Sequence, residues 1–340
     1  MEIEIHNEDC LGMRKLAHES VDVAVTSPPY NIGLKYGEYQ DRRNQSEYHD
    51  WCEAWGREIK RLLKPGGSFF LNVGGSSAGP LLPHALAIIF ADLFQIQNTF
   101  IWVKSITIEA GGQEISAGHF KPVNSPRYVN SCHEFIFHFT KTGSVPIDRL
   151  SVGVSYQDKS NISRWGHTSG NDRRCRGSCW FIPYDTIQKH RAHPAAFPIR
   201  LPINCIKLAG ARPDLVVMDP FMGGGTTGLA ARECGAARFI GYEIDPEYFA
   251  LAQEALGLAD PAESSRTQPA EDLTLAALEP NRGGRAATGS AVDLGGLGAG
   301  AARAEAGYAA GRPCSHGGLC AAGKIAAAPL GVRPALADAP

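Results

Sequence analysis

A chain of 340 residues with a formal net charge of −2 is long enough to bury a large core and carries no overall positive excess. It has no apolar run long enough to cross a membrane, and its acidic start, MEIEIHNEDC, is unlike a secretory signal. Its nine cysteines are unevenly spaced, which is typical of reduced thiols. These features exclude a small disulfide-rich protein and predict a cytoplasmic protein without a membrane partner.

The first part of the chain alternates short β-rich runs with helical patterns, as in an α/β sheet. Val21–Thr26 predicts a buried strand. Residues 46–67 have apolar side chains at helical spacing and predict a helix that stops at Pro65-Gly66-Gly67. Three further strands are expected at SFFLNV, FIWVK and EFIFHFTK, which are residues 68–73, 100–104 and 134–141.

The pattern then changes twice along the chain. Residues 142–192 are polar and rich in turn residues, which predicts a loop-rich insert. The α/β pattern returns as strand, helix, strand and helix in DLVVMD, TTGLAARECG, ARFIGYEI and DPEYFALAQEAL. Ala, Gly and Pro dominate residues 258–340, which predicts a disordered tail. Its Cys314, His316 and Cys320 are too few for a zinc site, and no metal is expected.

The stretch DLVVMDPFMGGGTTGLAA predicts a strand, a tight glycine turn and a helix. Its glycines match G-x-G-x-x-G, so one alternative is a nicotinamide-dependent oxidoreductase. An Asp-Pro-Phe stretch argues against that alternative, because a dinucleotide fingerprint places glycine directly after the strand. Glu243 ends the next strand, where a carboxylate can accept both hydroxyls of a ribose. A turn that merely links strand to helix is the other alternative.

Two motifs resemble those of the amino-group DNA methyltransferases that use S-adenosylmethionine. DPFMGGGTT resembles their D-P-F-x-G-x-G-T-T cofactor motif, and TSPPY resembles their catalytic [DNS]-P-P-[YFW] motif. The catalytic motif comes first, which is the order of the β group. Weaker agreement is found in NEDCLGMRKL, RLLKPGGSFFLNV, HEFIFHFTK and HPAAFPIRLP. The resemblance implies a Rossmann-like methyltransferase sheet in residues 1–257, with helices on both faces and a circularly permuted motif order.

The resemblance also assigns residues to the S-adenosylmethionine site. It implies that Glu243 binds the ribose and that Asp9 faces the adenine amine. His193, Pro194 and Phe197 would close the pocket from the other end. The methionine and ribose side would be lined by Asp219, Phe221, Gly223, Gly225, Thr226 and Thr227. This composition suits the cofactor, because a helix start favours its carboxylate and acidic or aromatic groups favour its sulfonium cation.

The Ser-Pro-Pro-Tyr stretch explains how a poor nucleophile could react. An exocyclic base amine is delocalised into its ring, and two acceptors that bind its hydrogens out of plane favour the tetrahedral, nucleophilic shape. Ser27 Oγ and the Pro28 carbonyl are the predicted acceptors, held rigid because Pro28 and Pro29 fix φ. Tyr30 offers a ring on which a flipped base stacks. The alternative is a diproline turn whose Tyr30 packs on the core.

The target base follows from the first residue of this motif. In the resembled family Ser accompanies methylation of cytosine at N4, whereas Asp usually accompanies adenine N6, so adenine is the alternative substrate. Ring-carbon methylation is excluded, because it needs a Cys nucleophile and the single Pro-Cys pair, Pro313-Cys314, lies in the tail. Action on RNA or protein, and DNA binding without catalysis, are remoter alternatives. A cognate restriction endonuclease is the expected functional partner.

The insert contains the basic excess that the overall charge conceals. Cations outnumber acidic residues over 149–191, as expected of a segment that binds double-stranded DNA. The predicted DNA-binding residues are Arg164, Arg173, Arg174 and Arg176. Trp165 and Trp180 are interpreted as packing residues of the insert, with wedging into the base stack as the alternative.

Overall fold

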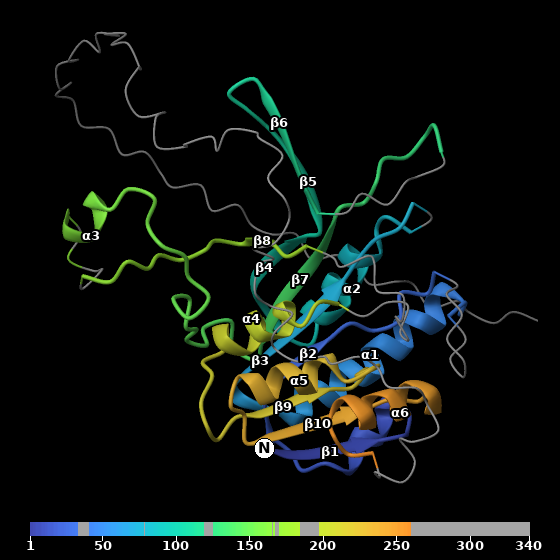
Figure 1. The fold of residues 1–340 in the computed structure, drawn as a ribbon. Coiled ribbons are helices and arrows are strands. Elements are labelled where there is room, and N and C mark those ends of the chain that lie inside the picture. The colour runs from blue at the N-terminus through green and yellow to red at the C-terminus, as the bar shows by residue number, and fades with distance from the viewer. Residues whose placement is uncertain are drawn as a thin grey trace, which may run out of the picture. The chain divides into compact units, whose positions relative to one another are not determined.

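The computed structural model describes residues 1–32, 41–77, 79–118, 125–164, 166, 170–183 and 197–259. The predicted disordered tail lies outside the described residues from residue 260 onwards. The described residues form a large sheet with helices on both faces (Figure 1). None of the described helices is long and apolar enough to span a bilayer.

The central sheet has eight strands among the described residues, in the order β1-β10-β9-β2-β3-β7-β4-β8. β7 runs antiparallel to β3 and β4, while the other neighbouring strands are parallel. The strands are β1 Glu2–His6, β2 Val21–Thr26, β3 Leu63–Val73, β4 Gln95–Val103, β7 His133–Thr140, β8 Cys179–Phe181, β9 Val216–Asp219 and β10 Arg238–Tyr242. This arrangement confirms the predicted Rossmann-like α/β class.

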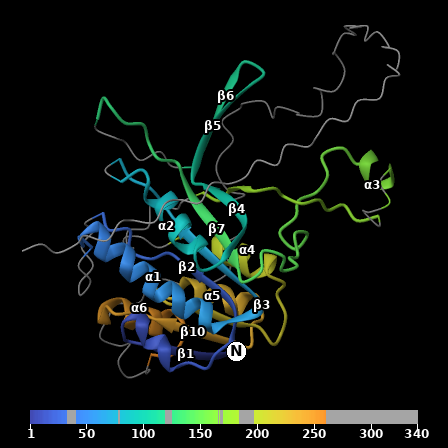
Figure 2. The same cartoon turned by 180° about the vertical axis from the view of Figure 1, so that it is seen from behind.

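Two groups of helices pack on opposite faces of the sheet, as the two views show (Figures 1 and 2). One face carries the 3-10 helix η1 Cys10–Lys15 and the helices α1 Gln45–Leu62 and α2 Leu82–Ala91. The other face carries α4 Arg200–Leu208, α5 Thr226–Glu233 and α6 Pro246–Ala255. The sheet is therefore the middle layer of three.

The sequence of β2 explains its central position. All six of its residues are buried, which fits the continuous run VDVAVT. Ala24 belongs to the core under α1, whereas Val23 and Val25 belong to the core under α4 and α5. Because side chains alternate along a strand, both faces of β2 are covered by helices.

The helix predicted over residues 46–67 is shorter than expected. α1 ends at Leu62, and Leu63 is already extended with φ −67° and ψ 131°. Lys64 precedes Pro65, and a residue before proline is disfavoured in the helical region. β3 therefore starts before the Pro-Gly-Gly stretch, and its pairing with β2 shifts register between Val21 and Val23.

Part of the predicted insert belongs to the main sheet. β8 pairs with β4, and Trp180 on β8 is fully buried with its ring 4.5 Å from that of Phe100. The wedge alternative is therefore wrong for Trp180, which packs in the core of the main sheet, while Trp165 lies outside the described residues. The short helix α3 Ser160–Arg164 lies away from the sheet (Figures 1 and 2).

A two-stranded hairpin that the sequence did not predict projects from the end of β4 (Figure 1). Its strands are β5 Ser105–Ala110 and β6 Gln113–Gly118. Gly111 and Gly112 form the turn with φ of 60° and 76°, a region that favours glycine.

Candidate active site

The two recognised motifs meet at the carboxyl ends of adjacent strands. β9 ends at Asp219 and continues through the glycine turn and α5 to β10, whereas β2 continues through Ser-Pro-Pro-Tyr and α1 to β3. β2 and β9 are neighbours in the sheet. The connection after β2 leads to α1 on one face, and the connection after β9 leads to α5 on the other face. Open α/β sheets bind ligands at such a switch point.

The glycine turn has the backbone that its sequence requires. Gly223 and Gly225 have φ of 52° and 86°, in the left-handed region that favours glycine. Gly225 is also the N-cap of α5. A Cβ on Gly228 would lie 2.8 Å from side-chain atoms of both Leu256 and Phe239. The third glycine of the motif therefore allows α5 to pack closely on β10 and the end of α6.

Asp219 ties the two motifs together. Its Oδ1 accepts hydrogen bonds from Thr26 Oγ1 at 2.6 Å and from the Phe221 N–H at 3.0 Å. Its Oδ2 accepts from Thr227 Oγ1 at 2.6 Å. Burial raises the pKa of Asp219 to about 6, although these hydrogen bonds oppose the shift. Because Thr26 directly precedes Ser27, the carboxylate joins the catalytic strand to the cofactor turn. A contact between Asp219 and the cofactor stays a prediction.

Glu243 stands half-buried at the end of β10, beside the glycine turn. Its Oε2 accepts from the Gly223 N–H at 2.9 Å, and its Oε1 accepts from the Asp245 N–H at 2.9 Å. Burial raises the pKa of this carboxyl. Each oxygen keeps a lone pair for a ribose hydroxyl. The Gly223 N–H is used within the protein, which disfavours its use on a dinucleotide pyrophosphate.

Asp9 lies at the same edge of the sheet. Asn7 donates from Nδ2 to the backbone oxygen of Glu243 at 2.9 Å, so the segment after β1 runs beside the end of β10. The exposed Asp9 caps η1 by accepting from the Leu11 N–H at 2.8 Å. Asp9 thus follows a segment that contacts the residue Glu243, and binding of the cofactor by Asp9 stays a prediction.

Two further predicted cofactor residues, Phe221 and Phe197, pack against the cores on opposite faces of the sheet. Phe221 is half-buried with its ring 5.4 Å from Trp51 and 5.2 Å from Trp55, so it belongs to an aromatic cluster on α1. Phe197 is half-buried and packs against the core on the other face. His193 and Pro194 lie outside the described residues.

The Ser-Pro-Pro-Tyr loop is fixed by contacts on both sides. Tyr48 on α1 donates its hydroxyl to the Pro29 carbonyl at 2.7 Å. After the motif, Asn31 has φ 56°, and its N–H donates to Asp41 Oδ1 at 2.7 Å. The Asn31 side chain donates to the Arg43 carbonyl at 2.9 Å and accepts from the Arg43 N–H at 2.6 Å. These contacts give the loop a defined conformation beyond that imposed by the two prolines.

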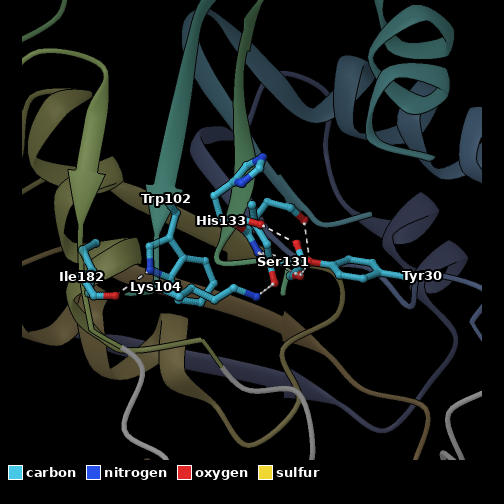
Figure 3. A network of polar contacts seen from close by, with 9 residues as sticks. Tyr30, Trp102, Lys104, Ser131, His133 and Ile182 are labelled. Atoms are coloured by element: carbon cyan, nitrogen blue, oxygen red, sulfur yellow. Dashed lines mark hydrogen bonds and ion pairs between the residues drawn. The ribbon is translucent and has the colours of Figure 1, made fainter. Parts of the chain in front are cut away.

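The Tyr30 hydroxyl sits in a network of polar groups (Figure 3). It lies 2.9 Å from Ser27 Oγ, 3.1 Å from Glu134 Oε2 and 3.1 Å from Asn72 Nδ2. Burial, followed by the charge of Glu134, raises the pKa of Tyr30 well above its ordinary value, so the phenol stays protonated. The Tyr30 ring also packs against the core. Its orientation is therefore set from both ends.

Sequence reasoning did not assign Asn72, Lys104 or Glu134 to the site. Asn72 lies at the end of β3 and donates to Glu134 Oε2 at 2.7 Å, while Lys104 Nζ lies 2.8 Å from Glu134 Oε1. The available signals were a polar residue inside the apolar run SFFLNV and an acid opening EFIFHFTK. Asn72 and Glu134 come together because β3 pairs antiparallel with β7.

The predicted DNA-binding arginines have different environments. Arg173 donates to the carbonyls of Leu150 and Ser151 at 2.8 and 3.0 Å, and half-buried Arg176 donates to another backbone carbonyl. These two side chains brace the backbone of the insert. Arg164, Arg173 and Arg174 are all exposed, and Arg174 donates only to the carbonyl of the adjacent Cys175, at 3.3 Å. The structure therefore distinguishes Arg173 and Arg176, which donate to backbone carbonyls far away in the sequence, from Arg164 and Arg174, which have no such hydrogen bond among the described residues. DNA contact by any of the four stays a prediction.

Comparison with known proteins agrees with this geometry. The sequence model of the N6/N4 methyltransferase family, described as DNA methylase, matches residues 21–254. The chain is 31% identical to the Type II methyltransferase M.BglII of Bacillus subtilis, over 74% of this chain and 68% of the relative.

Two solved structures share the fold. PvuII DNA methyltransferase (cytosine-N4-specific) has a TM-score of 0.54 and 23% identity, covering 77% of this chain and 88% of that one. The S-adenosyl-L-methionine complex of a Thermus thermophilus protein, a putative DNA modification methylase by its description, has a TM-score of 0.51 and 25% identity, covering 75% of this chain and 93% of that one.

Proposed function

Because the chain belongs to the N6/N4 DNA methylase family, and is thus an S-adenosylmethionine-dependent DNA amino-methyltransferase, we propose that it methylates cytosine at N4 within a specific site of duplex DNA. The observation that carries this proposal is Ser27 at the switch point, where its neutral hydroxyl stands in the rigid loop after β2. The cytosine-N4-specific description of the PvuII enzyme, which shares the fold, agrees with this choice.

The residues of the cofactor turn fit S-adenosylmethionine. When bound, this cofactor supplies a methyl group activated by a sulfonium cation. Glu243 would accept hydrogen bonds from the ribose, and Asp9 would face the adenine amine. The backbone at the start of α5 would bind the carboxylate of the cofactor, because a helix N-terminus favours negative charge. No phosphate has to be bound by this turn.

Ser27 and Pro28 would prepare the amine for attack. Ser27 Oγ and the Pro28 carbonyl accept its two hydrogens out of the plane of the base, which localises the nitrogen lone pair. Tyr48 and Asn31 hold the loop, so these acceptors are oriented before the base arrives. The Tyr30 ring would stack on the flipped base, a contact worth about 1–3 kcal/mol.

The target base has to leave the duplex, because its amine is otherwise paired. The exposed Arg164 and Arg174 of the insert would neutralise backbone phosphates or contact base edges. The relative M.BglII is described as a Type II methyltransferase. We therefore infer that the methylated site is also that of a restriction endonuclease.

Identification of the methylated base in DNA tests the proposal. DNA from cells that express the chain, or that express its Ser27→Ala variant, is digested to nucleosides and analysed by mass spectrometry. The proposal is supported if N4-methylcytosine is present in DNA from cells with the unmodified chain and absent from DNA of cells with the Ser27→Ala variant. N6-methyladenine instead would establish the second candidate, which Ser27 also allows because adenine presents the same amine and ring nitrogen. Sequencing of the same DNA would give the recognition site.

A further inference from the structure

The carboxylate of Glu134 is the end of a hydrogen-bonded chain that starts at Ser27. We propose that Glu134 is a positioning residue that acts through Tyr30, orienting Ser27 as an acceptor and taking up the proton that the methylated amine releases. This inference rests on the proposed transfer to an exocyclic amine, and it applies to either base. Tyr30 and Lys104, both labelled in Figure 3, contact the two oxygens of the Glu134 carboxylate.

The direction of each hydrogen follows from the chemistry of the groups. An ionised carboxylate can only accept, so at 3.1 Å Tyr30 donates its single hydrogen to Glu134 Oε2. The backbone carbonyl of Asn72 is a more distant acceptor, at 3.4 Å from the same hydroxyl. The Tyr30 oxygen then accepts the hydrogen of Ser27 Oγ, at 2.9 Å. Ser27 is thereby left with lone pairs for the base amine, which is the role that the mechanism needs.

Three features hold the Glu134 side chain in this position. Lys104 Nζ lies 2.8 Å from its other oxygen, in an ion pair whose side chains are 23% and 14% exposed. Asn72 donates to the same oxygen as Tyr30, at 2.7 Å. A Cβ on Gly74 would lie 2.9 Å from Glu134 Cγ, so the glycine leaves the space that this side chain occupies.

The orientation of the Asn72 amide leaves one buried polar atom without a hydrogen bond to any described residue, which lowers the stability of the fold. Its amide nitrogen faces the carboxylate, while its Oδ1 is buried without a hydrogen-bond partner among the described residues. An unpaired buried acceptor costs about 1–3 kcal/mol. A hydrogen-bonded network that keeps such a group is typical of functional sites and not of optimised packing.

Methyl transfer is followed by three proton transfers, which lead from the amine to Glu134. As the nitrogen bonds to the methyl carbon, the carbon–sulfur bond breaks and its electron pair stays on sulfur, which leaves a positive charge on the nitrogen. The amine then gives a proton to Ser27 Oγ, Ser27 gives its own to Tyr30 Oη, and Tyr30 gives its own to Glu134 Oε2. Glu134 ends neutral, and its partly exposed position allows the proton to pass to solvent.

The first test is single-turnover methyl transfer by the Glu134→Gln variant, with labelled S-adenosylmethionine and substrate DNA both saturating. The amide keeps the shape but can donate to Tyr30 and cannot take up the proton. We expect a rate about 100-fold lower, as for loss of general acid–base help, with unchanged affinities for cofactor and DNA. A normal rate would overturn the proposal.

A double variant tests whether Glu134 acts through Tyr30 or has only a structural role. Tyr30→Phe keeps the ring and removes the hydroxyl, so Glu134→Gln should cost little in that background. If the two losses multiply, Glu134 does not act through Tyr30 and the proposal is wrong. Glu58→Gln is the matched control, because Glu58 is 18% exposed and ion-paired with Arg61 on α1, and it should leave the rate unchanged.

A second variant covers the case in which Glu134→Gln fails to fold. Gly74→Ala keeps the carboxylate and displaces it, since the new Cβ would meet Glu134 Cγ. It should lower the single-turnover rate while cofactor binding is kept, and a wild-type rate would contradict the proposal. Failure of the unmodified protein to label any DNA would instead refute the proposed function, so the two failures are distinguishable.

Discussion

The proposed cofactor side and the proposed amine side of the site are built in different ways. One β9-α5-β10 unit supplies Asp219, Gly223, Gly225, Thr227 and Glu243. Within it, Thr227 donates to Asp219 and Gly223 donates to Glu243, over 8 and 20 residues of sequence. The amine side collects polar groups from β3, from β7 and from the segments that follow β2 and β4, which are far apart in the sequence. A local unit of this kind can be recognised from a motif, whereas a group assembled by sheet pairing cannot.

Asp219 is where the two sides are joined, so its removal should have the largest effect. Asp219→Ala leaves the Thr26 and Thr227 hydroxyls and the Phe221 N–H without their acceptor, at about 1–3 kcal/mol for each buried donor. We expect cofactor affinity and methyl transfer to fall together, by about 100-fold or more. Calorimetry and single-turnover kinetics measure the two effects.

Asp219→Asn is the matched control for this prediction. An amide of the same shape can accept from Thr26 and Phe221 through its oxygen and donate to Thr227 through its nitrogen, so most of the loss should be avoided. If Asp219→Ala affected only one of the two functions, the carboxylate would not join the two sides.

Features formed by residues close together in the sequence could be predicted, whereas features formed by strand pairing could not. The fold class, the central strands and the glycine turn follow from hydrophobic period and from glycine positions whose φ values are positive. The motif also located Ser27 and Tyr30. Glu134 could not be assigned, because its role depends on β7 pairing antiparallel with β3, which places residue 135 opposite residue 73.

Part of the insert was also beyond sequence reasoning. Polar composition over 142–192 predicted loops, yet Trp180 is the buried centre of a three-residue strand that extends the main sheet. A strand this short gives no readable periodicity. Likewise, four arginines in one basic segment look equivalent in sequence. Arg173 and Arg176 differ from the other two because they donate to backbone carbonyls of residues 150–152, which only the folded chain brings within reach.

Ser27→Ala should affect the amine side alone. Without Oγ the amine loses one of its two predicted acceptors, and by analogy with other preorganised hydrogen-bonding groups the methyl-transfer rate should fall by about 100-fold. Cofactor affinity should not change, because no Ser27 contact reaches the β9-α5-β10 unit among the described residues. A nearly normal rate in this variant would mean that the acceptor pair is not the source of catalysis.

Glu243→Gln should affect the cofactor side alone. Hydrogen bonds to a charged acceptor are worth about 1.5–3 kcal/mol, so we expect S-adenosylmethionine affinity to fall by about 10-fold or more, with a near-normal rate at saturation. Because burial raises the pKa of Glu243, the carboxylate is lost as the pH falls through that raised value. Cofactor affinity of the wild type should therefore weaken on the acid side.

The variant itself is the control for this pH dependence. Glu243→Gln has no titrating carboxyl at this position, so its affinity for S-adenosylmethionine should change much less between neutral and acid pH. An acid loss of the same size in both proteins would place the responsible group elsewhere.

The smallest effect is expected in the insert, where the comparison is between two kinds of arginine. Replacing exposed Arg164 and Arg174 by Ala should weaken DNA binding, with stability unchanged. The plot of the logarithm of the binding constant against the logarithm of the salt concentration should become less steep, by about 0.9 in slope for each lost phosphate contact. Arg173→Ala should instead lower the melting temperature, because the carbonyls of Leu150 and Ser151 lose their donor. Fluorescence anisotropy over a salt series measures the first effect and thermal melts the second. For each single replacement, Arg164→Ala or Arg174→Ala, the charge-matched control is Lys60→Ala, which removes an exposed cation on α1. A salt slope that falls equally for Lys60→Ala would show that general charge, and not the insert, binds the duplex.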